Sequence, residues 1–353
     1  MYSKRIKWCI LGEMLLLCSL FFIRMHLLSS NYESDESAND EAVEVAVAGN
    51  QEYIKWVDFT ITLEALNKAY KMDVETFGTK THLSWIDLLA YVAAKNGGKF
   101  GKSSINELEK VGKRLLEGET TLADLTSDLK YYAYYKEAYE AVLGGYVGEY
   151  ERECVSEDGT VKMEPCYGLK VFSPIAKGFP FSHYDDFGSS RSYGYKRVHL
   201  GHDMMGQIGT PIIAVESGYV EAIGWNQYGG WRLGIRSMDK KRYYYYAHLR
   251  QNYPYQSILK EGSIVTAGDV IGYMGHTGYS TKENVNNIEA VHLHFGVQLI
   301  FDESQKEGNN EIWIDCYDLT RFLEKNKSEV KKVEGTKEWE SVYNIKIPDI
   351  DNN

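Results

Sequence analysis

Residues of types that can bind metals, histidine and aspartate, occur in three short motifs in the second half of this sequence. The segment Val291–Leu299 alternates apolar residues with His292, His294 and Gln298. This period of two predicts a half-buried β-strand in which His292 and His294 point out of the same face. Two imidazoles this close can share one metal, or one can bind it while the other transfers protons. For this motif alone, a solvent-exposed pair without function is an equal alternative.

A second motif lies upstream and offers a nitrogen and an oxygen ligand of the kinds that zinc accepts. His199 and Asp203 stand four residues apart, and the glycines at 201 and 206 argue against a helix there. The pair is therefore expected at a strand end or in a tight turn. Between the two motifs, the segment Tyr246–Leu249 contains His248 and closes an aromatic run that predicts a strand. Five of the nine histidines fall in these three motifs.

The order H-x-G-x-D, Y-A-H-L, H-L-H-F resembles the M23 family of zinc endopeptidases, the lysostaphin and LytM type. The resemblance covers about residues 168–320. It includes further segments that match the family's pattern of strands and turns, namely Gly209–Ile212, Gly218–Val220 and Glu261–Gly272. No single segment is decisive, but the combination is specific.

The resemblance implies a role for each of the five motif residues. His199, Asp203 and His294 would bind Zn²⁺ and leave its fourth position to water and then to the scissile carbonyl. His248 and His292 would be the catalytic histidines that do not bind the metal, flanking the water and stabilising or protonating developing charges. The other histidines match no such role. Two are interpreted as structural or surface residues, His202 and His276, and three are unassigned, His26, His82 and His183.

Two departures from the family pattern border the expected groove. The segment Thr281–Ala290 is longer than the family's usual link before His292. Gly296 stands where many members carry an acidic residue. Neither departure touches a ligand, but substrate preference cannot simply be carried over from the family.

Length and composition limit the other classes of protein. A chain of 353 residues has room for two domains and a tail, and a hydrophobic content of 44% argues against wholesale disorder. The formal charge of −11 speaks against nucleic-acid binding, which requires a basic face. The 28 tyrosines fit amphipathic packing or a groove that grips glycan or peptide.

The N-terminal residues predict export. Lys4, Arg5 and Lys7 precede an apolar run, Trp8–Ile23, that only Glu13 interrupts. We interpret residues 1–30 as an uncleaved signal anchor, a single transmembrane segment that holds the remaining chain outside the cytoplasm at the cell membrane. A cleaved signal peptide, which would make the protein secreted, is the alternative. The acidic residues 31–50 are expected to form a solvated linker.

A small helical domain is predicted for residues 51–152. Three segments show helical spacing, and Ser84 is the N-cap candidate of the first of them: Trp85–Val92, Ile105–Leu115 and Leu122–Tyr139. This domain has no arrangement of catalytic or metal-binding residues. It could position the enzyme, cover its groove or bind an envelope protein partner.

Residues 153–167 are expected to form a hinge. Cys154 and Cys166 bracket a turn signal at Glu157–Thr160, which predicts a hairpin. The two cysteines could be joined by a disulfide outside the cell, or remain two reduced thiols.

Short β segments separated by glycines follow in residues 168–328, so an antiparallel sheet or compact barrel is expected. The predicted strands are Ile212–Ile223, Leu233–Ile235, Tyr243–His248, Ile264–Ala267 and Val270–Met274, with a closing helix at Trp313–Lys327. Residues 329–353 are expected to form a charged, mobile tail. The predicted fold class is α+β, with a mainly antiparallel M23-like domain after the anchor and the helical domain.

The sequence thus predicts a zinc metalloendopeptidase that cleaves peptide bonds in the stem peptides or cross-bridges of peptidoglycan. The first alternative is a catalytically inactive M23-like scaffold that binds a cell-envelope partner, but such a protein usually lacks one of the five motif residues. A lipoyl-like or sugar-transport barrel is the second alternative. Its turns resemble those of this chain, but it does not explain the H-x-G-x-D motif.

Overall fold

The computed structural model describes residues 53–192, 196–306, 308 and 310–347. The predicted signal anchor, residues 1–30, and the predicted acidic linker, residues 31–50, lie outside the described residues. Within the described ranges, no helix combines the length and the apolar character needed to cross a lipid bilayer. The described residues from Tyr53 onward belong to one compact unit.

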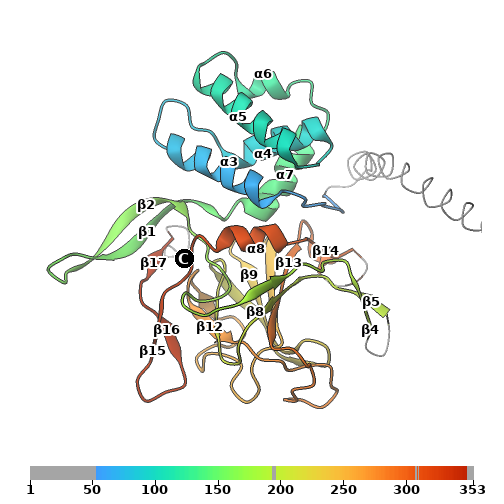
Figure 1. Ribbon diagram of the computed structural model, residues 1–353, viewed down its shortest axis with the longest axis vertical. Helices are drawn as coiled ribbons and strands as arrows, with labels where there is room; N and C mark the ends of the chain where they lie inside the picture. Colours follow the sequence, from blue (N-terminus) through green and yellow to red (C-terminus); the bar gives the residue numbers. More distant parts are fainter. Residues whose placement is uncertain (1–52, 193–195, 307, 309, 348–353) are drawn as a thin grey trace, which may run out of the picture. The chain divides into compact units, whose positions relative to one another are not determined.

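Helices make up the first part of this unit (Figure 1). They are α3 (Leu63–Thr76), α4 (Trp85–Asn96), α5 (Lys102–Leu116), α6 (Leu122–Thr126) and α7 (Tyr132–Leu143). The side chain of Ser84 accepts a hydrogen bond from the Asp87 amide and caps α4, as its position predicted. Gly97 ends the same helix in the left-handed conformation, with φ of 60°.

Two features of the helical region differ from the sequence prediction. The pattern did not predict α3, because its buried face consists mainly of small and polar residues, Ala65, Ala69, Asp73 and Thr76 beside Leu66. The predicted segment Leu122–Tyr139 is divided into α6 and α7. The side chain of Ser127 bonds to the Asp124 carbonyl at this break, and such local bonds compete with helix continuation.

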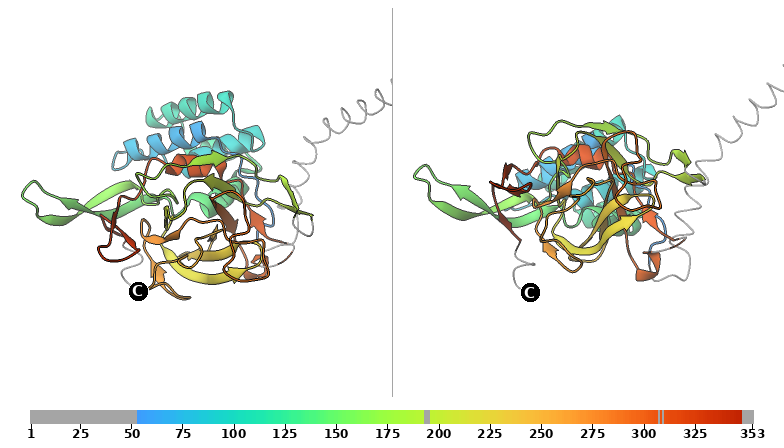
Figure 2. Two further views of the ribbon diagram at one scale, coloured as in Figure 1. Left: turned by 60° about the horizontal axis from the view of Figure 1, so that its bottom comes forward. Right: turned by 90° about the horizontal axis from the view of Figure 1, so that it is seen from below.

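The next element is a long hairpin that extends away from the sheet (Figures 1 and 2). Its strands are β1 (Val147–Val155) and β2 (Val161–Leu169), so the predicted hairpin turn is confirmed, and the residues predicted as a hinge lie within it. The predicted disulfide alternative is wrong. Cys154 pairs with Lys162 and Cys166 with Tyr150, and both thiols are free. The four-residue offset is about 13 Å along a strand, too far for a disulfide.

One antiparallel sheet, with strands of different lengths, carries the three motifs. Its strand order is β11-β8-β9-β10-β13-β6-β3, and β14 also pairs with β13. These strands are β3 (Ser182–Tyr184), β6 (His202–Met205), β8 (Gly218–Asn226), β9 (Gly230–Ser237), β10 (Arg242–Ala247), β11 (Ile264–Val265), β13 (His292–Leu299) and β14 (Ile312–Trp313). The predicted α+β class with a mainly antiparallel sheet is confirmed.

Smaller strand pairs complete the β region. They are β4 (Ser190–Ser192) with β5 (Lys196–Val198), β7 (Pro211–Ile213) with β12 (Val270–Tyr273), and β15 (Val330–Lys332) with β16 (Trp339–Ser341). The predicted strand Ile212–Ile223 is thus two strands, β7 and β8. A short 3-10 helix, Glu303–Gln305, precedes β14.

The predicted closing helix is shorter than expected and links the helices to the sheet. It is α8 (Tyr317–Leu323), while Trp313 belongs to β14. The buried ring of Phe322 contacts Tyr70 of α3 and Trp85 of α4, at centroid distances of 5.5 and 5.8 Å. The helical region and the sheet therefore share a hydrophobic contact through α8.

A buried ion pair strengthens the same junction. The fully buried Arg242 guanidinium donates to both Glu216 oxygens, at 2.8 and 3.1 Å, and to the Ala141 carbonyl of α7 at 2.7 Å. The bond to Ala141 joins α7 to the sheet. Removing either Arg242 or Glu216 would leave the other as an unpaired buried charge.

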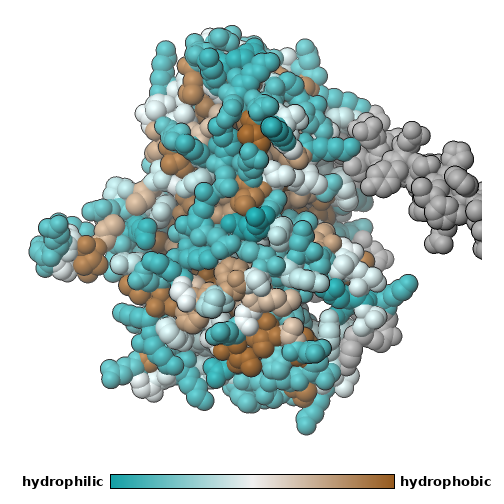
Figure 3. Space-filling view, viewed as in Figure 1, coloured by the Kyte–Doolittle hydropathy of each residue, from teal (hydrophilic) through white to brown (hydrophobic). Residues whose placement is uncertain are grey.

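The described part of the predicted tail, residues 329–347, contradicts the prediction that the tail is mobile. β15 and β16 form a hairpin, and β17 (Ile345–Lys346) pairs with β1. Ile345 and Ile347 are buried with Ala267. Their apolar side chains anchor a segment whose overall composition is charged. Elsewhere, the face seen in Figure 3 is largely hydrophilic, with hydrophobic side chains in small separate groups.

Candidate metal centre

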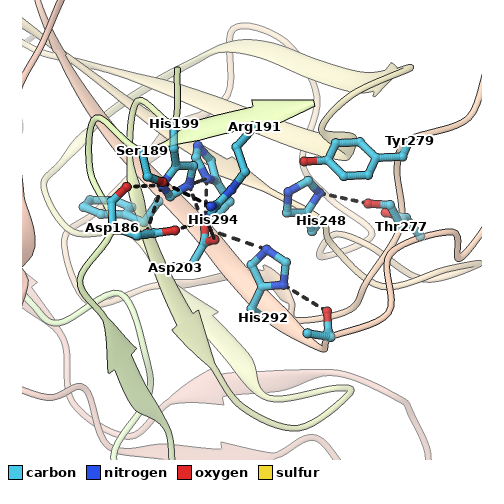
Figure 4. A network of polar contacts seen from close by, with 12 residues as sticks. Asp186, Ser189, Arg191, His199, Asp203, His248, Thr277, Tyr279, His292 and His294 are labelled. Carbon is cyan, nitrogen blue, oxygen red and sulfur yellow. Dashed lines mark hydrogen bonds and ion pairs between the residues drawn. The ribbon is translucent and has the colours of Figure 1, made fainter. Parts of the chain in front are cut away.

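Strand register brings two of the motifs together. On β13, His294 pairs with Asp203 of β6 on one side and with Ala247 of β10 on the other. Paired residues of an antiparallel sheet project to the same face. His199 reaches the same place from the loop between β5 and β6, and Figure 4 shows the three side chains converging.

The three candidate ligand atoms form a nearly equilateral triangle. His199 Nε2 lies 3.1 Å from Asp203 Oδ1 and 2.9 Å from His294 Nδ1, and the third side of the triangle is 3.0 Å. In a tetrahedral zinc site with bonds of about 2.0–2.1 Å, ligand atoms are roughly 3.3 Å apart. Two nitrogens and one oxygen therefore fit one face of a zinc tetrahedron.

The protonation states also suit a metal. Burial alone would raise the pKa of Asp203, but the adjacent His199 and His294 imidazoles hold that pKa far below its usual range. Burial lowers the pKa of His294. The carboxylate is thus ionised and the His294 imidazole neutral at physiological pH, which are the forms that bind metal ions.

Gly201 has a specific purpose in the H-x-G-x-D motif. A Cβ atom at this position would lie 2.6 Å from His294 Cε1 and 2.8 Å from the Phe295 carbonyl oxygen. The absence of a side chain lets the loop that carries His199 approach β13 closely. The sequence identified this glycine only as evidence against a helix.

Asp186 is a site residue that the sequence did not single out. One of its carboxylate oxygens lies 3.0 Å from His199 Nδ1, the nitrogen that faces away from Asp203. The other oxygen contacts the Arg191 guanidinium, which also lies 3.7 Å from Asp203 Oδ2. Neither Asp186 carboxylate oxygen makes an aligned hydrogen bond, whereas the Asp186 backbone carbonyl accepts one from His199 Nδ1 at 3.3 Å. A buried carboxylate here favours a proton on His199 Nδ1 and leaves Nε2 to bind a metal.

His248 and His292 stand beside the triangle with defined tautomers. His248 Nδ1 lies 2.9 Å from the Thr277 carbonyl oxygen, and His292 Nδ1 lies 2.9 Å from the Ala290 carbonyl oxygen. A carbonyl can only accept, so Nδ1 carries the proton in both rings and Nε2 keeps a lone pair. The two ring centroids are 4.8 Å apart. Burial lowers the pKa of His248 well below its usual value, with the neighbouring His292 and His294 adding to the effect.

All five residues lie on the wall of one groove of about 890 Å³. Its floor is the face of β8, β9, β10 and β13 that bears Arg232, Tyr245 and His294. Tyr279 lines the groove beside His248, with ring centroids 6.1 Å apart (Figure 4). The sequence did not single out Tyr279, whose only signal is its place beside a long loop.

The two departures from the family pattern both border this groove. The Gly296 position is covered by Trp313, since a Cβ atom there would lie 2.8 Å from the indole ring. Hydrogen bonds attach the Thr281–Ala290 segment to the sheet side of the groove. Asn284 Oδ1 accepts from Trp231 Nε1 at 2.9 Å and from the Asn252 amide at 2.8 Å.

The other histidines of the described ranges lie apart from the triangle, and His26 lies outside these ranges. His202 is buried on the opposite face of β6, where its Nε2 lies 2.7 Å from His183 Nδ1. His276 Nδ1 bonds to the Ile288 carbonyl oxygen at 2.7 Å and so supports the loop. His82 contacts Asp73 in the helical region.

The three motifs lie within a segment that matches a known protein family. Residues 197–308 match the profile of Peptidase family M23. The chain is 34% identical over 159 residues to the L-Ala--D-Glu endopeptidase of Bacillus subtilis (strain 168). This alignment covers 45% of each protein. It is 39% identical over 99 residues to lysostaphin of Staphylococcus simulans, covering 28% of this chain and 17% of lysostaphin. The matches thus span less than half of either relative.

One solved structure resembles most of the chain. It is a lytM protein from Ruminococcus gnavus ATCC 29149, with a TM-score of 0.52 and 23% sequence identity. The similarity covers 81% of this chain and 96% of that protein. At this identity the comparison concerns the fold, and it includes the helical region as well as the sheet.

Proposed function

This chain contains a peptidase family M23 domain homologous to L-Ala--D-Glu endopeptidase and lysostaphin, and we propose that it is a zinc-dependent endopeptidase that cleaves peptide bonds in peptidoglycan. The observation that carries the proposal is the triangle of His199, Asp203 and His294 on the wall of one groove, with His248 and His292 beside it. The cleaved bonds would lie in stem peptides or cross-bridges, the substrates of a cell wall hydrolase.

His199, Asp203 and His294 would hold the zinc ion. Their three ligand atoms lie within 4.8 Å of one another, and the groove leaves the outer side of the triangle accessible. When bound, zinc supplies a Lewis acid that lowers the pKa of water and polarises a carbonyl. The single negative charge of Asp203 offsets part of the metal's charge.

His248 and His292 would move the protons. Each holds its Nδ1 proton on a backbone carbonyl, so each has Nε2 available to accept a proton from the attacking water. Once protonated at Nε2, the imidazolium can donate to the developing oxyanion or to the departing amine. Because the ring of His248 is buried, its positive form is costly and the proton is readily passed on.

The inactive-scaffold alternative is less well supported. An inactive protein has no need of all five groups, yet here the five side chains line one groove. Cleavage of peptidoglycan requires action outside the cytoplasm. We therefore keep the signal anchor, the membrane association and the helical region's contact with an envelope protein as proposals.

Cell-wall digestion tests the proposal directly. The full-length protein, loaded with zinc, should release new amino termini from purified cell walls. A chelator should stop the release and added zinc should restore it. The control is His199→Ala under the same conditions. If the wild-type protein binds zinc but releases no amino termini, the scaffold alternative is correct.

A further inference from the structure

The cations that line the groove differ in how they are paired. The Arg191 guanidinium contacts Asp186, and Lys306 contacts Glu221. The Arg197 guanidinium lies over the rings of Tyr228 and Tyr279. Arg232 also lines the groove, but it makes no ion pair with any residue in the described ranges. A half-buried cation without an acidic partner suggests that its partner is a ligand.

Strand register places Arg232 close to the candidate metal centre. Leu233 of β9 pairs with Tyr246 of β10, so Arg232 comes beside Ala247, and Ala247 pairs with His294. Neighbouring strands are about 4.8 Å apart, so the Cα atoms of Arg232 and His294 are separated by roughly 10 Å across the same face. This distance corresponds to about three residues of an extended peptide.

Two tyrosines form the floor around Arg232. The ring of Tyr243 lies across β9, since a Cβ atom on Gly234 would be 1.9 Å from the Tyr243 hydroxyl. Burial raises the pKa of Tyr243 to about 12, while the charge of Arg232 opposes that rise. Burial also raises the pKa of Tyr245, and Arg232 again acts against it. The guanidinium therefore lies near both phenols, on a floor where water is partly excluded and a charge-assisted hydrogen bond is strong.

None of the acidic residues that line the groove in the described ranges forms an ion pair with Arg232. Glu221 is engaged by Lys306, and Glu311 accepts a hydrogen bond from Trp313 Nε1 at 2.7 Å. Glu289 is exposed on the long loop. The groove floor thus carries a positive charge that no ion pair offsets, although the whole chain carries a formal charge of −11.

We propose that Arg232 forms a carboxylate-binding subsite and that the preferred substrate is an anionic peptide with a free carboxylate within about three residues of the scissile bond. This inference rests on the proposed function and specifies its substrate class. A bridge made only of glycine has no such carboxylate, so it should be the poorer substrate.

The test compares charged and neutralised forms of one substrate. Soluble peptide fragments from purified bacterial cell walls are divided, and the carboxylates of one half are amidated with a carbodiimide and ammonia. Pentaglycine amide, whose C-terminus is blocked, serves as the peptide without a carboxylate. kcat/KM for release of amino termini is measured for the wild-type protein and for Arg232→Gln, Arg232→Lys and Arg321→Gln. Arg321 pairs with Asp318 on α8 and is the matched control for loss of one positive charge.

The wild-type protein and Arg321→Gln should prefer the native fragments by roughly 10- to 100-fold, the effect of one charge-assisted hydrogen bond. Arg232→Gln should lose this preference, because kcat/KM should fall much more on the native fragments than on the amidated ones. Arg232→Lys should keep part of it, because lysine retains the charge but not the bidentate geometry. Zinc content and melting temperature verify that the variants are folded.

Two results would overturn the subsite. One is equal or better cleavage of the amidated fragments by the wild-type protein, and the other is an equal loss on both substrates in Arg232→Gln. Failure of the zinc-loaded wild-type protein to cleave any of the peptides would instead overturn the proposed function, and the subsite with it.

Discussion

Two groups of histidines lie on opposite faces of strand β6. Asp203 projects into the groove with His199 and His294, whereas the preceding residue, His202, projects to the other face and meets His183. In the first group three atoms converge at 2.9–3.1 Å. In the second group the contacts run in a line, from His202 to His183 at 2.7 Å and from His183 to Glu324 at 2.8 Å.

The difference shows what distinguishes a metal site from a chain of hydrogen bonds. Because the Glu324 carboxylate accepts from His183 Nε2–H, His183 Nδ1 accepts from His202 Nε2–H. Both nitrogens of His183 are thus used by different partners in different directions. The Tyr317 ring lies against both imidazoles, at centroid distances of 5.9 and 5.3 Å. Among the described residues, only the groove-side group has three ligand atoms close enough for one ion.

The largest expected effect follows from removing a groove-side ligand. His199→Ala should lose stoichiometric zinc and all measurable activity, because two remaining ligands do not hold the ion. Some stability should be lost as well, since Asp203 and His294 then lose their contacts with His199 and with the metal. Metal analysis of the purified variant, together with the cell-wall assay, measures both effects.

The same substitution on the other face is the matched control. His183→Ala should keep stoichiometric zinc, because His183 touches His202 and Glu324 but none of the three candidate ligands. A zinc-free His183→Ala, or a fully loaded His199→Ala, would show that the two groups have been assigned the wrong way round.

A smaller effect is expected for the two histidines beside the triangle, His248 and His292. His248→Ala and His292→Ala should each retain zinc while the rate falls by roughly 10²–10⁴-fold, the usual contribution of a general acid or base. His292 and His294 are on the same strand and line the same groove, yet only the loss of His294 should empty the site. Zinc content and kcat of the three single variants separate the roles, and an empty site in His248→Ala would contradict them.

A local pattern and a family resemblance together predicted the groove-side residues. The alternation in Val291–Leu299 predicts β13 and the shared face of its two histidines, because side-chain direction in a strand depends only on a period of two. The three-motif order then supplied His199, Asp203 and His248. The prediction needed no knowledge of which strands are neighbours.

The remaining features depend on contacts between distant parts of the chain. Asp186 lies in a loop, and its role at the site depends on the contact of that loop with His199. His183 reaches His202 because β3 joins the sheet at β6. The tail was predicted to be mobile from its charge, yet Ile345 and Ile347 bury in the core. A helix such as α3, whose buried face is small and polar, gives little apolar periodicity to detect.

A moderate effect is expected at the residue that orients the first ligand. Asp186→Asn keeps the size of the side chain but removes the charge that favours a proton on His199 Nδ1. Loss of such an outer carboxylate typically costs 10- to 100-fold in metal affinity. Competition with a zinc chelator measures this affinity, with His183→Gln as the control for the opposite face. Unchanged zinc affinity in Asp186→Asn would mean that the carboxylate only binds Arg191.

The smallest effect concerns stability and belongs to the buried face of β6. Burial lowers the pKa of His202 from 6.5 to about 3, with His183 adding to the shift. Between pH 6.5 and about 3 the unfolded chain therefore takes up a proton that the folded chain does not. The free energy of unfolding should fall as the pH is lowered through this range, by at most about 1.4 kcal/mol per pH unit from this group.

His202→Gln isolates this contribution, because an amide can still donate to His183 Nδ1 but does not titrate. Denaturant unfolding of the chelated wild-type and variant proteins, measured from pH 7 down to pH 3, should show the weaker pH dependence in the variant. Zinc binding and cell-wall cleavage at neutral pH should stay close to those of the wild type, since His202 faces away from the groove. If the free energy of unfolding depends on pH in the same way in both proteins, the pKa of His202 does not differ between the folded and the unfolded chain. A loss of zinc in His202→Gln would mean that the two faces of β6 are not independent, because the buried group would then hold Asp203 in position.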